Sequence, residues 1–89
     1  MREMLLDTRK VEGETDRLRC RYYVLIGEKQ VGNFFCEAYG VKIEDEGTGE
    51  SAAFPDLTVS AKRIDELMEL LLRNQVTPVG LEDVIQDWL

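Results

Sequence analysis

The sequence contains no histidine, and only two cysteines and two prolines among its 89 residues. Without histidine, the chain lacks the commonest general base, the commonest zinc ligand and the side chain that usually titrates near neutral pH. Two cysteines are too few for a disulfide scaffold. Unbroken apolar runs are only a few residues long, as at Leu70–Leu72, whereas a membrane-spanning helix needs about 20 residues. These absences argue against histidine-dependent catalysis, a disulfide-stabilised miniprotein and a membrane-spanning chain.

Charge of both signs is present but unevenly distributed. The formal net charge is −7; residues 1–43 carry +1 and residues 44–89 carry −8. Because an acidic surface repels phosphates and anionic lipid headgroups, we expect neither a nucleic-acid nor a membrane partner. The same acidity also keeps a small domain soluble without serving any partner. The N-terminus has no apolar segment of signal-peptide length, so we expect a cytoplasmic protein with reduced thiols.

Alternating polar and apolar residues predict strands in the first half of the chain. The predicted strands are 4–11, Arg17–Ile26, Phe34–Glu44 and a short return strand Ser51–Phe54, which Pro55 ends at a sheet edge. We expect turns over 12–16 and Glu44–Glu50, and a loop from Gly27 to Asn33. Gly40 inside the third strand predicts a bulge or bend. If the two long strands form a hairpin, Cys20 and Cys36 lie too far apart for a disulfide.

After Ser60 the apolar spacing becomes helical. The apolar positions follow the i, i+3, i+4, i+7, i+8 pattern of one helix face: Ile64, Leu67, Met68, Leu71 and Leu72. Ser60 is the expected N-cap. Thr77 and Pro78 have the residue types of an N-cap and first helical position for a second helix. Strands followed by helices predict one α+β domain over residues 1–89, an antiparallel β-meander of three to four strands followed by two C-terminal helices packed on one face.

Three arginines at alternate positions form a stripe on one face of the second predicted strand. Arg17, Arg19 and Arg21 are followed on the same face by Tyr23 and Leu25. Such a stripe could bind an anion or the carboxylates of a partner. It could equally pair across the sheet with acids of neighbouring strands, for which Glu3, Asp7 and Glu37 are candidates. Both interpretations stay open from the sequence, and the stripe is a candidate partner contact.

The second predicted helix carries the other candidate contacts. Asp83 and Asp87 are four residues apart, so both carboxylates point the same way, as a metal pair or a solvated helix face requires. Trp88 and Leu89 form an apolar end that must be buried, either on the sheet of the same chain or on a partner. The acidic turn Glu44–Glu50 lacks the spacing of a calcium loop.

Four segments resemble a family of small uncharacterised Firmicutes proteins of about this length. The ending Val76–Leu89 contains a Val-Thr-Pro, Asp-Val-Ile and Asp-Trp-Leu pattern. The strand segments Arg21–Tyr23 and Tyr39–Ile43 and the leucine-rich helix Ile64–Leu72 complete the resemblance. The family is a domain of unknown function, so the resemblance implies a bacterial, cytosolic setting and no activity.

These observations predict a non-enzymatic protein–protein interaction module, for which a homodimer is one of the open arrangements. The alternative is an acidic inhibitor that covers a basic surface of its target, with the charge of residues 44–89 supplying the attraction. A carboxylate-based metal enzyme using Asp83 and Asp87 is the third hypothesis. We expect no catalytic residues and no cofactor, and a protein partner that is either a second copy or another chain.

Overall fold

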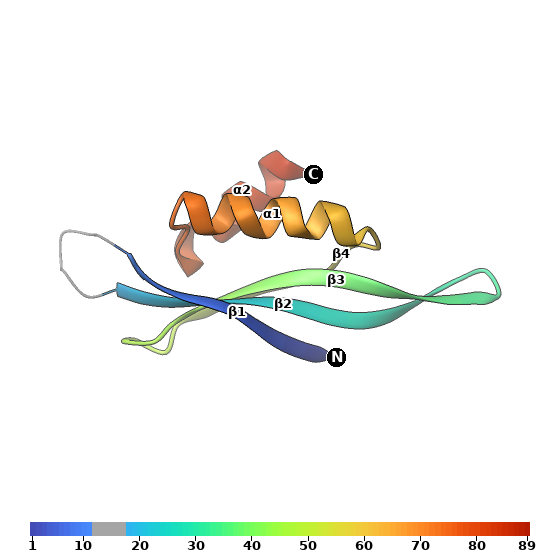
Figure 1. The fold of residues 1–89 in the computed structure, drawn as a ribbon, viewed down its shortest axis with the longest axis horizontal. Coiled ribbons are helices and arrows are strands. Elements are labelled where there is room, and N and C mark those ends of the chain that lie inside the picture. Colours follow the sequence, from blue (N-terminus) through green and yellow to red (C-terminus); the bar gives the residue numbers. More distant parts are fainter. Residues whose placement is uncertain (12–17) are drawn as a thin grey trace.

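The computed structural model describes residues 1–11 and 18–89 and consists of one antiparallel sheet and two helices (Figure 1). The elements are β1 (Arg2–Val11), β2 (Leu18–Val31), β3 (Phe34–Asp45), β4 (Ser51–Thr58), α1 (Ala61–Arg73) and α2 (Pro78–Trp88). The strand order β1-β2-β3-β4 makes the sheet a meander, because each strand pairs with its neighbour in sequence. The predicted α+β fold is therefore confirmed. The turn predicted over 12–16 lies outside the described residues.

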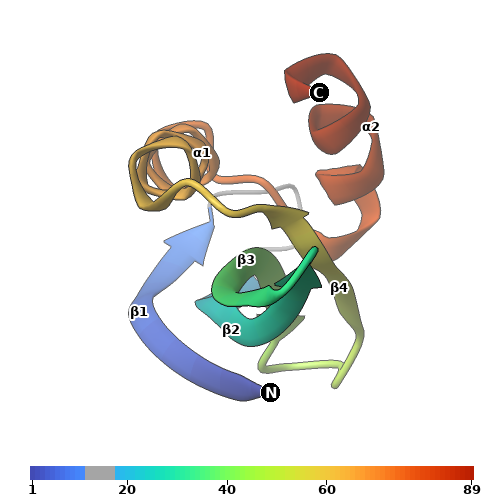
Figure 2. The ribbon, with the colours of Figure 1, turned by 90° about the vertical axis from the view of Figure 1, so that its right-hand side faces the viewer.

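Both helices lie on the same face of the sheet (Figures 1 and 2). α1 contacts β2, β3 and β4, and α2 contacts β3 and β4. The core fills the space between the helices and this face; its buried side chains are Cys20, Tyr22, Val24, Val41, Ile43, Ile64, Leu67, Met68, Leu71, Val76, Leu81 and Ile85. The apolar stripe predicted for the first helix is thus its buried face, although Leu72 is only half-buried.

Local chemistry explains where the helices begin. The Ser60 hydroxyl accepts a hydrogen bond from the Arg63 backbone amide at 3.2 Å, which satisfies one of the free amides of the first turn. Thr77 occupies the N-cap of α2 as predicted, but its side chain makes no capping bond. Between the helices, the buried Tyr22 hydroxyl donates to the Val76 carbonyl oxygen at 2.8 Å. This bond ties the helix connection to the centre of the sheet.

The pairing of β3 with β4 contains the bulge that Gly40 predicts. Tyr39 pairs with Thr58, but Val41 pairs with Phe54, so β4 has extra residues opposite Gly40. A Cβ at Gly40 would lie 2.2 Å from the Phe54 carbonyl oxygen, so only glycine fits there. Pro55 lies inside the bulge and does not end β4, contrary to the prediction, because a residue without an amide hydrogen fits where ladder pairing is interrupted.

The strand pairing also places the two cysteines. Cys20 lies opposite Asp45, and Cys36 lies opposite Lys29. Both thiols are free, as predicted. Burial among apolar neighbours raises the pKa of the Cys20 thiol, and the nearby Asp45 carboxylate raises it further.

Candidate functional site

The β2–β3 hairpin extends beyond the rest of the sheet. β1 begins its pairing with β2 at Ile26, and β4 ends its pairing with β3 at Tyr39. Beyond these positions, Gly27–Val31 pairs only with Phe34–Ala38, and no other described strand adjoins them. We call these two segments the distal ribbon; it projects past the helices at one end of the molecule, whose longest dimension is 50 Å (Figure 1).

A two-residue turn closes the distal ribbon. Val31 pairs with Phe34, which leaves Gly32 and Asn33 as the turn. Gly32 has φ +62°, whereas Asn33 does not have a positive φ. A positive φ at the first central position alone is the pattern of a type II′ turn, whose twist matches that of the flanking strands and favours glycine at this position. The turn therefore extends the hairpin as regular structure to its tip.

Three large apolar side chains are exposed at this tip. Phe34 is 77%, Phe35 71% and Val31 53% exposed. Since side chains alternate along a strand, Phe34 and Val31 share the sheet face away from the helices, and Phe35 lies on the helix-side face. Single exposed apolar residues are ordinary on protein surfaces, but a group that covers both faces of a projecting ribbon is typical of an interaction site.

The sequence-based prediction missed this site. The sequence assigns Gly27–Asn33 to a loop because Gly27 and Gly32 bound the segment. Glu28, Lys29 and Gln30 within it show no apolar alternation that would indicate a strand. The prediction is wrong because these residues lie in a ribbon that has no core on either face, so no burial imposes alternation. The Gly32-Asn33 pair between Val31 and Phe34 is the signal of a two-residue hairpin, and it could have identified the turn.

The predicted arginine stripe forms part of a charge network on the sheet face away from the helices. Arg21 contacts two carboxylates: Nη1 lies 2.9 Å from Glu44 Oε1, and Nη2 lies 3.3 Å from Glu46 Oε1. The Tyr23 hydroxyl donates to the same Glu44 oxygen at 3.4 Å. Lys42 lies 5.2 Å above the Tyr23 ring. Arg19 is exposed on this face, and Arg17 lies outside the described residues.

Hydrogen bonds within this network raise the pKa of the Arg21 guanidinium, the largest cause being the bond with Tyr23 and the next the bond with Glu44. Arg21 of the stripe thus pairs across the sheet, but Glu3 and Glu37, two of the predicted partners, are paired elsewhere. Glu3 contacts Lys42 at 3.2 Å, and Glu37 contacts Arg2 at 3.0 Å. The prediction named the kind of partner correctly and assigned those two acids wrongly, because strand register decides which acids lie opposite Arg21.

The candidate contacts at the C-terminus lie on the opposite side of the sheet, in the helix layer (Figure 2). Asp83 and Asp87 are exposed on α2. Trp88 packs partly against the core, and the Arg63 guanidinium of α1 lies 4.3 Å from its ring centroid. Arg63 Nη2 also donates to the Trp88 carbonyl oxygen at 3.3 Å. Trp88 is therefore bound within its own chain, whereas Leu89 is 73% exposed.

The predicted site residues consequently form two separate surfaces. Arg19, Arg21 and Tyr23 lie on the outer face of the sheet, while the residues of α2 lie in the layer that covers its other face. These two surfaces are separate from each other. Both are also separate from the tip of the distal ribbon. Of the three surfaces, the ribbon tip exposes the largest apolar side chains.

Comparison with known protein families gives a match over nearly the whole chain. The profile of a family of unknown function, DUF6514, matches residues 2–89. The chain belongs to the DUF6514 family. Neither a curated protein nor a solved structure matches it. Membership of DUF6514 agrees with the resemblance to an uncharacterised family, and the family description assigns no activity to any residue.

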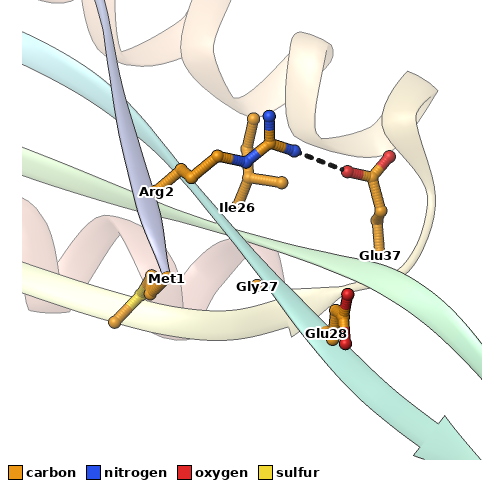
Figure 3. Close-up of a pocket in the computed structure, with 6 residues that line it drawn as sticks. All are labelled: Met1, Arg2, Ile26, Gly27, Glu28 and Glu37. Carbon is orange, nitrogen blue, oxygen red and sulfur yellow. Dashed lines mark hydrogen bonds and ion pairs between the residues drawn. The ribbon is translucent and has the colours of Figure 1, made fainter.

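Two surface hollows of this DUF6514 chain lie at the base of the distal ribbon. One, of about 340 Å³, is lined by Met1, Arg2, Ile26, Gly27, Glu28 and Glu37 (Figure 3). The other, of about 280 Å³, is lined by Met1, Leu25, Gly27, Glu28, Ala38, Pro55 and Asp56. The Arg2–Glu37 ion pair spans the first hollow, and both side chains are more than half exposed. Water competes for such polar groups, so this hollow is poorly suited to hold a small ligand.

The acidic turn of the DUF6514 chain uses its buried carboxylate for its own fold. Asp45 is 5% exposed, and its Oδ1 accepts hydrogen bonds from the backbone amides of Gly47 at 2.8 Å and Thr48 at 3.4 Å. Within residues 1–11 and 18–89, no three potential histidine, cysteine or carboxylate ligands lie close enough to hold a metal ion. No helix among these residues has the length and apolar character needed to span a membrane.

Proposed function

We propose that this DUF6514 chain is a non-enzymatic protein-interaction module that docks through the tip of its distal ribbon. One observation carries the proposal: Phe34 and Phe35 are about three-quarters exposed on opposite faces of a two-stranded ribbon that projects from the core. An isolated two-stranded ribbon is marginally stable in water, and exposed aromatic rings add no stability there. Side chains of this kind are common anchors of protein interfaces.

The rest of the molecule supports a binding role over catalysis. Arg21, Lys42 and Arg63 each contact side chains of the same chain, so these cations already have internal partners. The buried Asp45 carboxylate accepts backbone amides, which is a structural use. We place the module in the cytoplasm of a bacterium, as the resemblance to Firmicutes proteins implies, where the thiols of Cys20 and Cys36 stay reduced.

The acidic inhibitor is the second candidate, and α2 supplies the observation that favours it. Its three acidic side chains, Glu82, Asp83 and Asp87, are all exposed, and the helix contains no basic residue. A basic surface of a target protein would be attracted to this helix. Because such attraction is screened by salt, binding through α2 would weaken steeply as ionic strength rises, whereas apolar docking at the ribbon would not.

Affinity capture with single-residue variants tests the proposal. The tagged full chain, Phe34→Lys and Phe35→Lys are each incubated with a lysate of the native organism and washed at low and high salt. Val79→Lys is the matched control, because Val79 is an equally exposed apolar residue on α2. We expect a stoichiometric protein that the parent chain and Val79→Lys retain at high salt and that both phenylalanine variants lose.

Two other results would contradict docking at the ribbon. Equal capture by all variants would place the contact elsewhere. Capture that salt abolishes, and that Asp83→Lys removes while Phe34→Lys does not, would support the acidic inhibitor in its place.

A further inference from the structure

The distal ribbon has two unpaired edges, and the turn determines which backbone groups they present. A two-residue hairpin closes on a pair that exchanges both backbone hydrogen bonds, which here is Val31 with Phe34. Antiparallel pairs alternate between this type and one whose amide and carbonyl groups point away from the partner strand. On β3, the outward groups are therefore those of Phe35 and Glu37. On β2, they are those of Gln30 and Glu28.

The two edges differ in side-chain chemistry. The β3 edge reads Phe-Phe-Cys-Glu-Ala from Phe34 to Ala38, while the β2 edge reads Gly-Glu-Lys-Gln-Val from Gly27 to Val31. Charged and polar side chains discourage edge pairing, whereas an exposed aromatic edge favours it. The β3 edge is thus the one open to a further strand.

The β3 edge is complementary to itself when two copies run antiparallel. Pairing about a two-fold axis at Phe35 places Phe35 opposite Phe35 of the second copy and Phe34 opposite its Cys36. In this register the outward groups of Phe35 meet each other, as ladder hydrogen bonds require. Moving the axis to Glu37 would oppose two like charges, which is destabilising.

We infer that a second copy of this chain binds along the β3 edge of the distal ribbon, with the two-fold axis at Phe35. The inference rests on the proposed function and names the partner of the same site. The two ribbons then lie side by side as four strands, joined over Phe34–Cys36 of each copy. Because an edge-to-edge two-fold axis is perpendicular to the sheet, the helix layers of both copies lie on one side, and both Phe35 rings meet on that side. Such an interface is isologous, as in most homodimers.

The size of this contact predicts a weak dimer. Two phenylalanines about three-quarters exposed bring on the order of 300 Å² per copy. This register pairs only Phe34–Cys36 of each copy, because Glu37 and Ala38 lie opposite the turn residues of the second copy. The total therefore stays below the ~1,000 Å² at which biological interfaces begin. Dissociation at high micromolar concentration is therefore expected. Each copy carries −7, so added salt should maintain or strengthen the dimer by screening repulsion.

Sedimentation equilibrium of the full chain tests the oligomeric state. We expect a concentration-dependent mass that approaches twice 10.2 kDa, and at least a tenfold weaker association for Phe35→Lys. Gln30→Lys is the matched control, because Gln30 pairs with Phe35 but lies on the β2 edge. The variant adds the same charge there and should leave association unchanged. A chain that stays monomeric at millimolar concentration overturns the inference, as does equal weakening by both variants.

A cysteine pair tests the register independently. Phe34→Cys places a new thiol opposite Cys36 of the second copy, at a separation that a disulfide can bridge. We expect this variant to form a covalent dimer under mild oxidation, and Val31→Cys, on the β2 edge, to remain monomeric on a reducing-agent-free gel. Equal crosslinking of both variants would contradict the register. If the chain is monomeric but a different protein is captured through Phe34 and Phe35, the proposed function stands and only the second copy is wrong.

Discussion

The two long strands β2 and β3 pass through two environments. Over Cys20–Ile26 and Tyr39–Asp45 they lie between neighbouring strands, and two helices cover one of their faces. Over the distal ribbon they have only each other. Backbone pairing is continuous from one region to the other. Strand geometry therefore does not depend on burial here, whereas the stability of each region does. We therefore expect the body of the sheet to determine the folding free energy, which leaves the distal ribbon for the proposed binding role.

Truncating one buried and one exposed side chain should show the largest difference between the two regions. Leu71 is fully buried on α1, so Leu71→Ala should lower the free energy of unfolding by about 2–5 kcal/mol. Phe34→Ala should change it by less than about 0.5 kcal/mol, because Phe34 is exposed at the tip. Urea denaturation followed by circular dichroism measures both at a concentration where the chain is monomeric. Similar losses for the two variants would show that the ribbon belongs to the folded core.

Two glycines offer a second comparison. Gly40→Ala should destabilise the fold by about 1–3 kcal/mol, because the new methyl group meets the Phe54 carbonyl and Pro55 Cα in the β4 bulge. Gly27, at the base of the ribbon, has no atom within 4 Å of such a methyl group. Gly27→Ala should be neutral or stabilising by up to about 1 kcal/mol. Thermal melts of both variants check this; a stable Gly40→Ala chain would contradict the close approach of β4.

Removal of a buried hydroxyl should have a smaller effect. Tyr22→Phe removes the hydrogen bond to the Val76 carbonyl and leaves that buried acceptor without the tyrosine hydroxyl. The free energy of unfolding should fall by about 1–3 kcal/mol. Tyr23→Phe is the control, because its hydroxyl lies on the outer face at 3.4 Å from a half-buried Glu44 carboxylate. Urea melts should show the larger loss for Tyr22→Phe. The reverse order would mean that the outer network, not the helix connection, stabilises the body.

The smallest effect is expected from pH. The folded state holds the Cys20 proton more tightly than the unfolded chain does, because burial and Asp45 raise its pKa. Stability is therefore retained below the ordinary thiol pKa of about 8.5 and declines as pH rises toward the folded-state pKa. Cys20→Ala should flatten the decline measured by urea denaturation from pH 8 to 10, and Cys36→Ser should not. An unchanged slope in Cys20→Ala would assign the decline to other groups.

The sequence predicted the body of the molecule well and the distal ribbon poorly, for one physical reason. Burial imposes periodicity, so the stripe from Ile64 to Leu71 and the alternation from Cys20 to Val24 could be read directly. Apart from Ala38 at its base, the ribbon has no buried residue, and Glu28–Gln30 therefore resemble a loop. Its turn was readable only from Gly32 and Asn33, whose conformational preferences are local.

The candidate site required long-range information that periodicity does not contain. Glu44 and Glu46 follow Arg21 in sequence by more than 20 residues, and only the register of β2 against β3 brings them to Arg21. The exposure of Phe34 and Phe35 depends on how far β1 and β4 extend. β4 continues past a bulge at Pro55 to Thr58, whereas the sequence predicts that Pro55 ends the strand.

The bond between Tyr22 and the Val76 carbonyl joins residues 54 positions apart and has a consequence for folding during synthesis. All strand pairs join neighbours in sequence, so the hairpins can form in order as the chain leaves the ribosome. The helices that cover Tyr22, Val41 and Ile43 emerge after all four strands. Until then, the nascent sheet exposes its whole apolar face, and this interval is when the chain is most open to aggregation or to capture by a chaperone.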